Sequence, residues 1–227
     1  MSETSSRRSS SIEDYIRAIY GLVERGEAVT NTSLAGRLEV SPSSASGMVT
    51  KLSQLGLVTH VPYRGIELTA EGTQLAHGVL RRHRLIETYL VQHLGYTWDE
   101  VHAEADALEH VVSDRLVARI AAKLGNPVRD PHGDPIPAAD GSVEEEPARL
   151  LDELQPGAIG EIVRVWDTDP DLLRYLSEHA IGLGERIEVL ERQPFGGPIV
   201  VKVGAEPDAA THALGKAIAQ ALSVAVR

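Results

Sequence analysis

Histidines and carboxylates recur at helical spacing in the middle of this chain. Four of them stand at positions i, i+4, i+7 and i+8 of one segment: His102, Asp106, Glu109 and His110. This spacing places all four side chains on one face of a helix. An earlier pair with i, i+4 spacing, His83 and Glu87, belongs to the preceding predicted helix. Imidazole nitrogens and carboxylate oxygens are ligands of divalent metal ions, so a metal site between two packed helices is one interpretation.

A second interpretation needs no metal. One His-x-x-x-Glu pair is usually a solvated helix face or an i, i+4 hydrogen bond. Six such residues on two neighbouring helices form a larger set, and buried carboxylates repel one another without a cation. The spacing alone leaves both interpretations open. The other histidines lack such neighbours and are interpreted as surface or structural residues: His60, His77, His93, His132, His179 and His212.

Composition restricts the metal chemistry and the location of the protein. The chain has no cysteine, so disulfides and thiolate sites are excluded and any metal must be held by nitrogen and oxygen. At 227 residues it is long enough for two or three small domains. The sequence shows neither an apolar run long enough to span a membrane nor the apolar core of a secretory signal. We therefore expect a cytoplasmic protein with no membrane partner.

The N-terminal third has the pattern of a winged helix-turn-helix. Residues 1–10 are rich in Ser and Arg and predict a disordered tail, after which apolar residues repeat every three or four positions from Ile12. A short helix over 33–38, a turn and a second helix to about residue 55 follow, and the second helix has a Ser-Pro start. Two short strands around the sequence PYRG, at 57–60 and 65–69, then predict a wing.

Two further regions complete the predicted architecture. Long helical patterns over 71–95 and 98–124 carry the histidines and carboxylates, and a stretch rich in Pro, Gly and Asp follows them. The remaining segments alternate as short strands around a Pro-started helix at 170–179, which is typical of an SH3-like β-barrel. The fold class is therefore mainly α with a small β component. We expect an N-terminal winged helix-turn-helix DNA-binding domain, a helical dimerisation and metal-binding domain and a C-terminal SH3-like β-barrel, over residues 1–74, 75–143 and 144–227.

The distribution of charge bears on a nucleic-acid partner. A formal net charge of −11 argues against one, because phosphate binding usually relies on Lys and Arg. Residues 1–75 carry seven Lys or Arg against eight Asp or Glu, whereas residues 127–227 carry nine against eighteen. The acidity therefore belongs mainly to the C-terminal part, and the N-terminal third can still present a locally positive face.

Several segments together resemble the diphtheria toxin repressor family of metal-dependent transcriptional regulators. These segments are SIEDYIRAIYGL, VSPSSASGMVTKLSQLGLV, the wing YRGIELTAEG, RRHRLIETYL, VHAEADALEHVVSD and RDPHGDPIP. The resemblance implies a primary metal site at Asp14, Asp106, Glu109 and His110. It implies an ancillary site at His83, Glu87 and His102, to which the third domain can lend a ligand, here Asp167.

Two of the implied primary-site positions favour manganese. Iron-sensing members of the family have a methionine at the position of Asp14 and a cysteine at that of Asp106, whereas manganese-sensing members have carboxylates there. Hard oxygen donors suit Mn²⁺ better than sulfur does. Arg17 departs from some small manganese sensors, which have a glutamate there, so their two-metal arrangement is not implied. We expect Mn²⁺ as the cofactor, with Fe²⁺, Co²⁺ or Zn²⁺ as substitutes in vitro.

The same resemblance implies a homodimeric repressor that binds palindromic operator DNA and controls metal-uptake genes. Residues at the start of the second helix of the helix-turn-helix are candidates for base and phosphate contacts: Ser41, Pro42, Ser43, Ser44 and Ser46. Lys51 and the wing residue Arg64 are candidates for phosphate contacts. Helix capping is the alternative role for the serines. Apolar residues in 98–124 can form a dimer interface or an ordinary core: Val101, Leu108, Val112, Leu116 and Ile120.

Three alternatives remain open. The first is an iron- or zinc-responsive regulator of the same family. The second is a metalloenzyme, but the sequence contains no nucleophile elbow, phosphate loop or second catalytic cluster, so we expect neither an enzyme nor a small-molecule substrate. The third is a metal-independent winged-helix protein, whose DNA affinity would not respond to chelators.

Overall fold

The computed structural model divides the chain into two compact units. One unit contains residues 1–83 with 137–142, and the other contains 84–136 with 143–227. Each unit is described by itself. The structure describes residues 3–61, 65–144, 146–166, 169–205 and 207–226.

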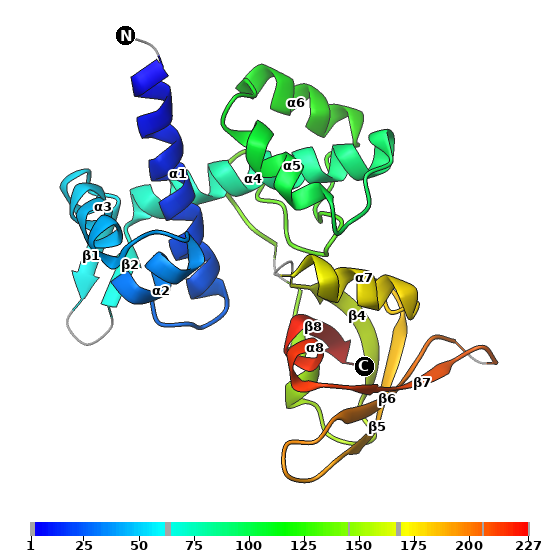
Figure 1. Cartoon of the computed structure of the whole chain (residues 1–227). Helices are drawn as coiled ribbons and strands as arrows, with labels where there is room; N and C mark the ends of the chain where they lie inside the picture. The colour runs from blue at the N-terminus through cyan, green and yellow to red at the C-terminus, as the bar shows by residue number, and fades with distance from the viewer. Residues whose placement is uncertain (1–2, 62–64, 145, 167–168, 206, 227) are drawn as a thin grey trace. The chain divides into compact units, whose positions relative to one another are not determined.

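The N-terminal unit is a helix-turn-helix followed by a β-hairpin (Figure 1). Its helices are α1 (Glu3–Glu24), α2 (Asn31–Arg37), α3 (Pro42–Gln54) and the first part of α4 (Ala70–Leu94). Strands β1 (Val58–Val61) and β2 (Gly65–Leu68) pair antiparallel directly after α3. The predicted helix-turn-helix and hairpin are thus confirmed. The core of this unit contains fully buried aliphatic side chains, among them Ile16, Ile19, Leu34 and Leu52.

Helix α1 begins earlier than the sequence predicted. It starts at Glu3, so the prediction of a disordered tail is wrong for residues 3–10. Extending an existing helix fixes one residue for each added hydrogen bond, whereas starting a helix is costly. The amphipathic segment after Ile12 packs against the core and is helical. The helix therefore propagates from it into the polar N-terminal extension.

Capping residues and a tight turn set the ends of the two helices of the helix-turn-helix. The Thr30 side chain caps α2 in a capping box with Ser33, and the Ser41 hydroxyl accepts from the backbone N–H of Ser44 at the start of α3. Pro42 occupies the first turn of α3, where its missing N–H costs nothing. The turn between the helices passes through Glu39, whose φ of 53° lies in the left-handed region.

The C-terminal unit begins with the helices that carry the predicted metal ligands. These are the second part of α4, α5 (Val101–Glu109) and α6 (Asp114–Lys123). The prediction of one helix over 98–124 is therefore wrong. Ser113 is an N-cap whose hydroxyl accepts from the N–H of Leu116, and this cap starts a new helix. The side chains of Val101 and Ile120 are buried here, whereas Leu116 is exposed.

The rest of this unit is a six-stranded antiparallel sheet in the order β3-β8-β4-β5-β6-β7 (Figure 1). Fully buried side chains such as Ile162, Leu173 and Leu214 form its core. Three short helical segments accompany it: η1 (Leu151–Glu153), α7 (Pro170–Glu178) and α8 (Lys216–Ala221). The strands are β3 (Arg149–Leu150), β4 (Ile159–Val165), β5 (Arg186–Arg192), β6 (Ile199–Val203), β7 (Ala210–Leu214) and β8 (Leu222–Val226).

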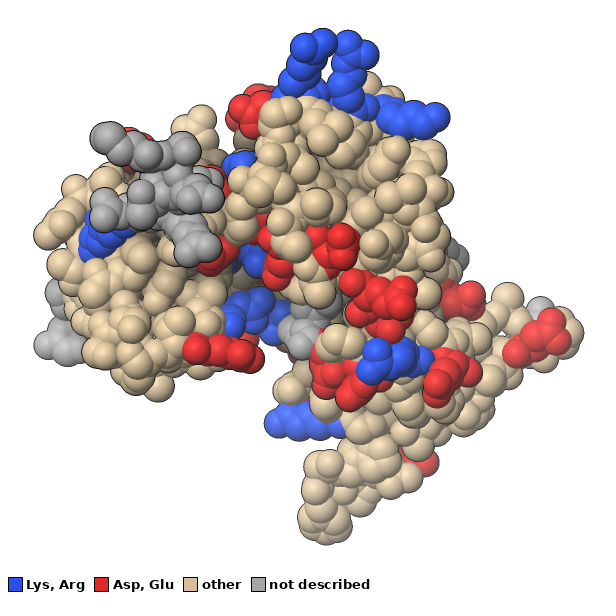
Figure 2. All heavy atoms as spheres, turned by 45° about the horizontal axis from the view of Figure 1, so that its top comes forward, with Lys and Arg blue, Asp and Glu red and all other residues tan. Residues whose placement is uncertain are grey.

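The distribution of acidic side chains on the surface follows their distribution along the chain. Figure 2 shows acidic side chains gathered on the C-terminal part of the face in view, as the distribution of Asp and Glu along the chain predicts. Among the described residues, no helix combines the length and the apolar character that crossing a bilayer would require.

Candidate metal centre

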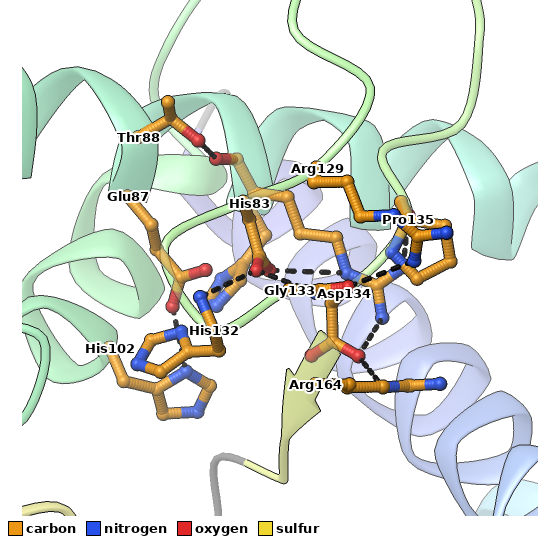
Figure 3. Close-up of polar contacts among 12 residues, drawn as sticks. His83, Glu87, Thr88, His102, Arg129, His132, Gly133, Asp134, Pro135 and Arg164 are labelled. Atoms are coloured by element: carbon orange, nitrogen blue, oxygen red, sulfur yellow. Dashed lines mark hydrogen bonds and ion pairs between the residues drawn. The ribbon is translucent and has the colours of Figure 1, made fainter. Parts of the chain in front are cut away.

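Two helices of the C-terminal unit present carboxylates and imidazoles to each other. On α4 the side chain of Glu87 is only 1% exposed, although it is charged in water. Its Oε1 lies 3.1 Å from Nδ1 of His102 on α5. Nε2 of His102 lies 3.8 Å from Oδ2 of Asp106, one turn later on α5. The predicted i, i+4 face on α5 thus lies against the predicted ligand on α4 (Figure 3).

The other two predicted residues of this face lie at the end of α5. Glu109 is the last residue of α5 and is buried, and His110 is its C-cap. Nε2 of His110 lies 3.3 Å from Oε1 of Glu109. Asp14, the predicted partner of this pair, belongs to α1 in the N-terminal unit.

His83 is the last residue of the N-terminal unit and lies on α4, one turn before Glu87. Within that unit a guanidinium nitrogen of Arg17 lies 3.1 Å from Nδ1 of His83. A guanidinium only donates hydrogen bonds, so Nδ1 accepts here. A neutral His83 ring therefore carries its proton on Nε2.

The structure adds two residues that sequence reasoning missed. Asp130 and His132 lie in the loop between α6 and β3, and both are buried. One ligand atom from each of them and one from Glu87 all lie within 4.8 Å of one another. His132 therefore has two carboxylate neighbours in space that its position in the sequence did not indicate. The only sequence signal was the compact D-P-H-G-D spacing, which lies in a loop and has no helical periodicity.

A backbone carbonyl fixes the orientation of the His132 ring. Nε2 of His132 lies 2.7 Å from the carbonyl oxygen of Trp98. A carbonyl accepts, so Nε2 carries the proton and Nδ1 of the neutral ring keeps its lone pair for a cation. The indole ring of Trp98 stacks on the imidazole with an interplanar angle of 7°. Such outer contacts commonly set the tautomer of a metal-ligating histidine.

Hydrogen bonds fix the position of the Asp130 carboxyl group, and its surroundings disfavour its negative charge. One of its oxygens accepts hydrogen bonds from the backbone N–H groups of His132 and Asp134, at 2.8 and 2.9 Å. The pKa of Asp130 is raised to about 8, first by burial and then by the negative charges of Asp134 and Glu87, whereas Arg84 and His132 oppose the shift. A positive ion beside Asp130 would favour its charged form.

The donor set fits a divalent metal ion. Glu87 and Asp130 supply carboxylate oxygens and His132 supplies an imidazole nitrogen, all buried and without sulfur. Such oxygen and nitrogen donors suit Mn²⁺, Fe²⁺ and Zn²⁺. Asp167, the predicted ligand from the third domain, lies outside the described residues, directly after Trp166 at the end of β4.

The predicted DNA-contacting residues lie on the exposed start of α3. Ser41, Ser43 and Ser44 are exposed, and the Ser41 hydroxyl lies 2.9 and 2.8 Å from the hydroxyls of the other two. Ser41 is also the N-cap, so the capping role predicted for one serine is confirmed. Pro42 and Ser46 are exposed as well, and Lys51 on the same helix is half-buried. Arg64 lies outside the described residues.

Comparison with known proteins decides the family. The model of the "Iron dependent repressor, N-terminal DNA binding domain" matches residues 8–66. The "Iron dependent repressor, metal binding and dimerisation domain" matches residues 69–138, and the FeoA domain matches residues 149–226. The iron-dependent repressor IdeR of Mycobacterium tuberculosis (strain ATCC 25618 / H37Rv) is 35% identical over 218 residues, which cover 91% of this chain and 94% of that protein. This chain belongs to the iron-dependent repressor family.

Further relatives and solved structures are similar over most of the chain. The diphtheria toxin repressor of Corynebacterium diphtheriae (strain ATCC 700971 / NCTC 13129 / Biotype gravis) is 32% identical over 190 residues, covering 79% of this chain and 84% of that protein. A solved structure described as a manganese-dependent transcriptional repressor in complex with manganese is 47% identical, with a TM-score of 0.91 over 95% of this chain and 100% of that one. ScaR with bound Cd²⁺ is 36% identical, with a TM-score of 0.82 over 94% of this chain and 98% of that one.

These relatives confirm the resemblance and the fold class that the sequence predicted. They are transcriptional repressors and not enzymes, in agreement with the expectation for this chain. IdeR is named for iron and one of the structural neighbours for manganese, so the names of the relatives leave the identity of the ion open.

Proposed function

We propose that this chain is a metal-dependent transcriptional repressor whose activating ion is manganese(II). The observation that carries the proposal is the buried, sulfur-free cluster of Glu87, Asp130 and His132, beside the contacts of Glu87 with His102. Manganese is the weakest binder of the divalent series, so a site that selects it must rely on hard oxygen donors and on geometry. This donor set meets the first requirement.

Two ions per chain fit the residues best. We propose that Glu87, Asp130 and His132 hold the ancillary ion, with Asp167 as a further ligand. His102 contacts Glu87, and His83 lies one turn earlier on the same helix, so both belong to this group as ligands or as hydrogen-bond partners. The resemblance supports the primary ion at the remaining predicted positions: Asp14, Asp106, Glu109 and His110.

The proposed primary site explains how a metal would control DNA binding. Asp14 lies on α1 of the DNA-binding domain, whereas the other three ligands lie on α5 and at its end. A bound ion would place positive charge beside these carboxylates and reduce their mutual repulsion. Ligands drawn from two domains couple metal occupancy to the orientation of the helix-turn-helix, and such coupling is typically worth about 1 to 3 kcal/mol.

We further propose a homodimer on palindromic operator DNA in the cytoplasm, where it controls metal-uptake genes. Family membership supports dimerisation and DNA binding, and two identical reading heads favour a two-fold symmetric site. The exposed serines at the start of α3 are the proposed base and phosphate contacts, with Lys51 and Arg64 as proposed phosphate contacts. Neither a membrane nor a small-molecule substrate takes part in this function.

A DNA-binding titration tests the proposal. The apo-protein is added to a fluorescent fragment of its own promoter region at fixed salt, with Mn²⁺, Fe²⁺ and Zn²⁺ in turn, because phosphate contacts make affinity depend on salt. We expect Mn²⁺ to produce tight binding that a chelator reverses. Equal binding with and without metal would refute metal dependence. Activation by Fe²⁺ but not by Mn²⁺ would assign the chain to the iron-responsive alternative, which the names of its sequence relatives favour.

A further inference from the structure

The loop that carries Asp130 and His132 lies on strand β4 of the C-terminal domain. We propose that Arg164 of β4 is a positioning residue for these two metal ligands, so that the C-terminal domain sets the affinity of the ancillary cluster for its ion. The inference rests on the proposed ancillary site, and it concerns described residues of a single compact unit.

Backbone contacts place the loop directly on the strand. The carbonyl oxygen of His132 accepts a hydrogen bond of 2.8 Å from the N–H of Val165. The next residue, Gly133, has a φ of +86°, and a Cβ there would lie 2.1 Å from the carbonyl oxygen of Val163. Only glycine permits this approach. The peptide that follows a metal ligand is therefore in contact with β4 without an intervening side chain.

The side chain of Arg164 fastens the end of the same loop. Its guanidinium forms an ion pair with Asp134, and the two side chains are 17% and 12% exposed (Figure 3). The guanidinium also lies over the ring of Trp166, 3.7 Å from the ring centre. A planar, stacked and largely buried guanidinium is more narrowly oriented than a solvated surface cation. Arg164 thus fixes Asp134 two residues after His132.

A row of alternating charges connects Arg164 to the metal cluster. Asp134 lies 3.8 Å from a guanidinium nitrogen of Arg84, and Nε of Arg84 lies 3.7 Å from Asp130. Arg84 also donates a 2.6 Å hydrogen bond to the carbonyl oxygen of Pro135. Loss of Arg164 would leave Arg84 as the ion-pair partner of Asp134 among the described residues. Arg84 would then be drawn toward Asp134, and both ends of the loop would lose their anchor.

The opposite side of the cluster is fastened to the same domain. Trp98, whose carbonyl orients His132, donates its indole N–H to the hydroxyl of Ser177 on α7, at 2.6 Å. Its neighbour Asp99 lies 3.2 Å from Arg174, also on α7. The C-terminal domain therefore contacts the surroundings of His132 from two elements, β4 and α7.

Calorimetric titration of the full-length chain with Mn²⁺ tests this role in four proteins: wild type, Glu87→Gln, Arg164→Gln and Arg186→Gln. Glu87→Gln identifies which class of bound ion belongs to the ancillary cluster. Outer contacts of metal ligands are commonly worth about 10- to 100-fold in metal affinity, so we expect Arg164→Gln to weaken that class roughly 10-fold. Arg186→Gln is the matched control, because Arg186 pairs with Glu188 on β5, 3.2 Å away, and it lies outside the loop contacts.

Two outcomes separate the inference from the proposed site. If Glu87→Gln binds Mn²⁺ like the wild type, the ancillary site itself is wrong. If Glu87→Gln loses one class of ion but Arg164→Gln keeps wild-type affinity within about twofold, only the positioning role fails. Should Arg164→Gln not fold, Arg164→Lys retains the charge but not the planar fork, and we expect an intermediate loss of Mn²⁺ affinity.

Hydrogen exchange gives a second test. Mn²⁺ should slow exchange at the Val165 amide in the wild type and much less in Arg164→Gln. Equal slowing in both proteins would overturn the inference.

Discussion

The carbonyl oxygen of Trp98 lies 2.7 Å from Nε2 of His132, and the indole of the same residue stacks on that imidazole at 7°. One residue thus determines both the tautomer and the plane of a buried histidine. The consequence is chemical, because only Nδ1 of the neutral ring is left to bind a cation. The Trp98 carbonyl and indole thus orient His132 for its proposed role as a metal ligand.

Replacing His132 should remove one metal ion per chain. His132→Ala deletes the imidazole nitrogen of the buried Glu87, Asp130 and His132 cluster, so the remaining donors should hold a divalent ion weakly in competition with water. Bound manganese after dialysis, measured by elemental analysis, should fall by one ion per chain. The control is His93→Ala, an exposed histidine on α4. Unchanged stoichiometry in His132→Ala would exclude the cluster as a metal site.

Asp106 should be required for metal-dependent repression but not for folding. Its side chain is 41% exposed, so Asp106→Ala leaves no large cavity. We expect the thermal midpoint of the apo-protein to change little and the Mn²⁺-induced increase in DNA affinity to disappear. Glu104→Ala, on the same helix but outside the ligand face, should retain the increase. A normal manganese response in Asp106→Ala would refute the proposed primary site.

The stability of the apo-protein should depend on pH through Asp130. Its folded-state pKa is about 8, whereas the unfolded chain releases this proton near pH 4. Between these values the folded state binds more protons, so the free energy of unfolding contributed by Asp130 falls as pH rises from about 4 to about 8. Urea unfolding in the presence of a chelator measures the slope. Asp130→Asn should flatten it, and equal slopes in both proteins would contradict the burial argument.

The turn of the helix-turn-helix offers a stabilising substitution. Glu39 has a φ of 53°, a conformation that costs a residue with a Cβ roughly 1 to 2 kcal/mol. Glu39→Gly should relieve part of this cost, offset by the greater freedom of glycine in the unfolded chain, for a net gain of about 0.5 to 1 kcal/mol. Urea unfolding of the two proteins measures it. Glu67→Gly, in the middle of β2, should destabilise instead, and a loss of stability in both variants would contradict the turn argument.

The sequence predicted those features that are marked by a regular spacing of residues or by capping residues at the end of an element. The start of α3 at Ser41 and Pro42 and the contact of His102 with Asp106 on one face of α5 follow from local capping and spacing. The break between α5 and α6 was missed, because the apolar period continues through it and only the cap at Ser113 marks it.

The cluster of Glu87, Asp130 and His132 was missed for a related physical reason. Its three members come from a helix and from a loop more than forty positions further along the chain, and loop residues have no period that aligns them with a helix face. Which atoms meet is decided by tertiary contacts, among them the bond from Val165 to the His132 carbonyl. By contrast, pairs such as His102 and Asp106 are set by a single helix and are visible in any helical reading of the sequence.

The close approach of Gly133 to β4 limits how this protein can be shortened or recombined. A truncation after the helical domain would remove the contacts of this loop with β4 and the ion pair of Asp134 with Arg164. A chimera with the C-terminal domain of another repressor would need a strand that leaves equal space for the loop. The C-terminal domain is thus poorly suited to exchange as an independent module, because its strand β4 supports the loop that carries Asp130 and His132.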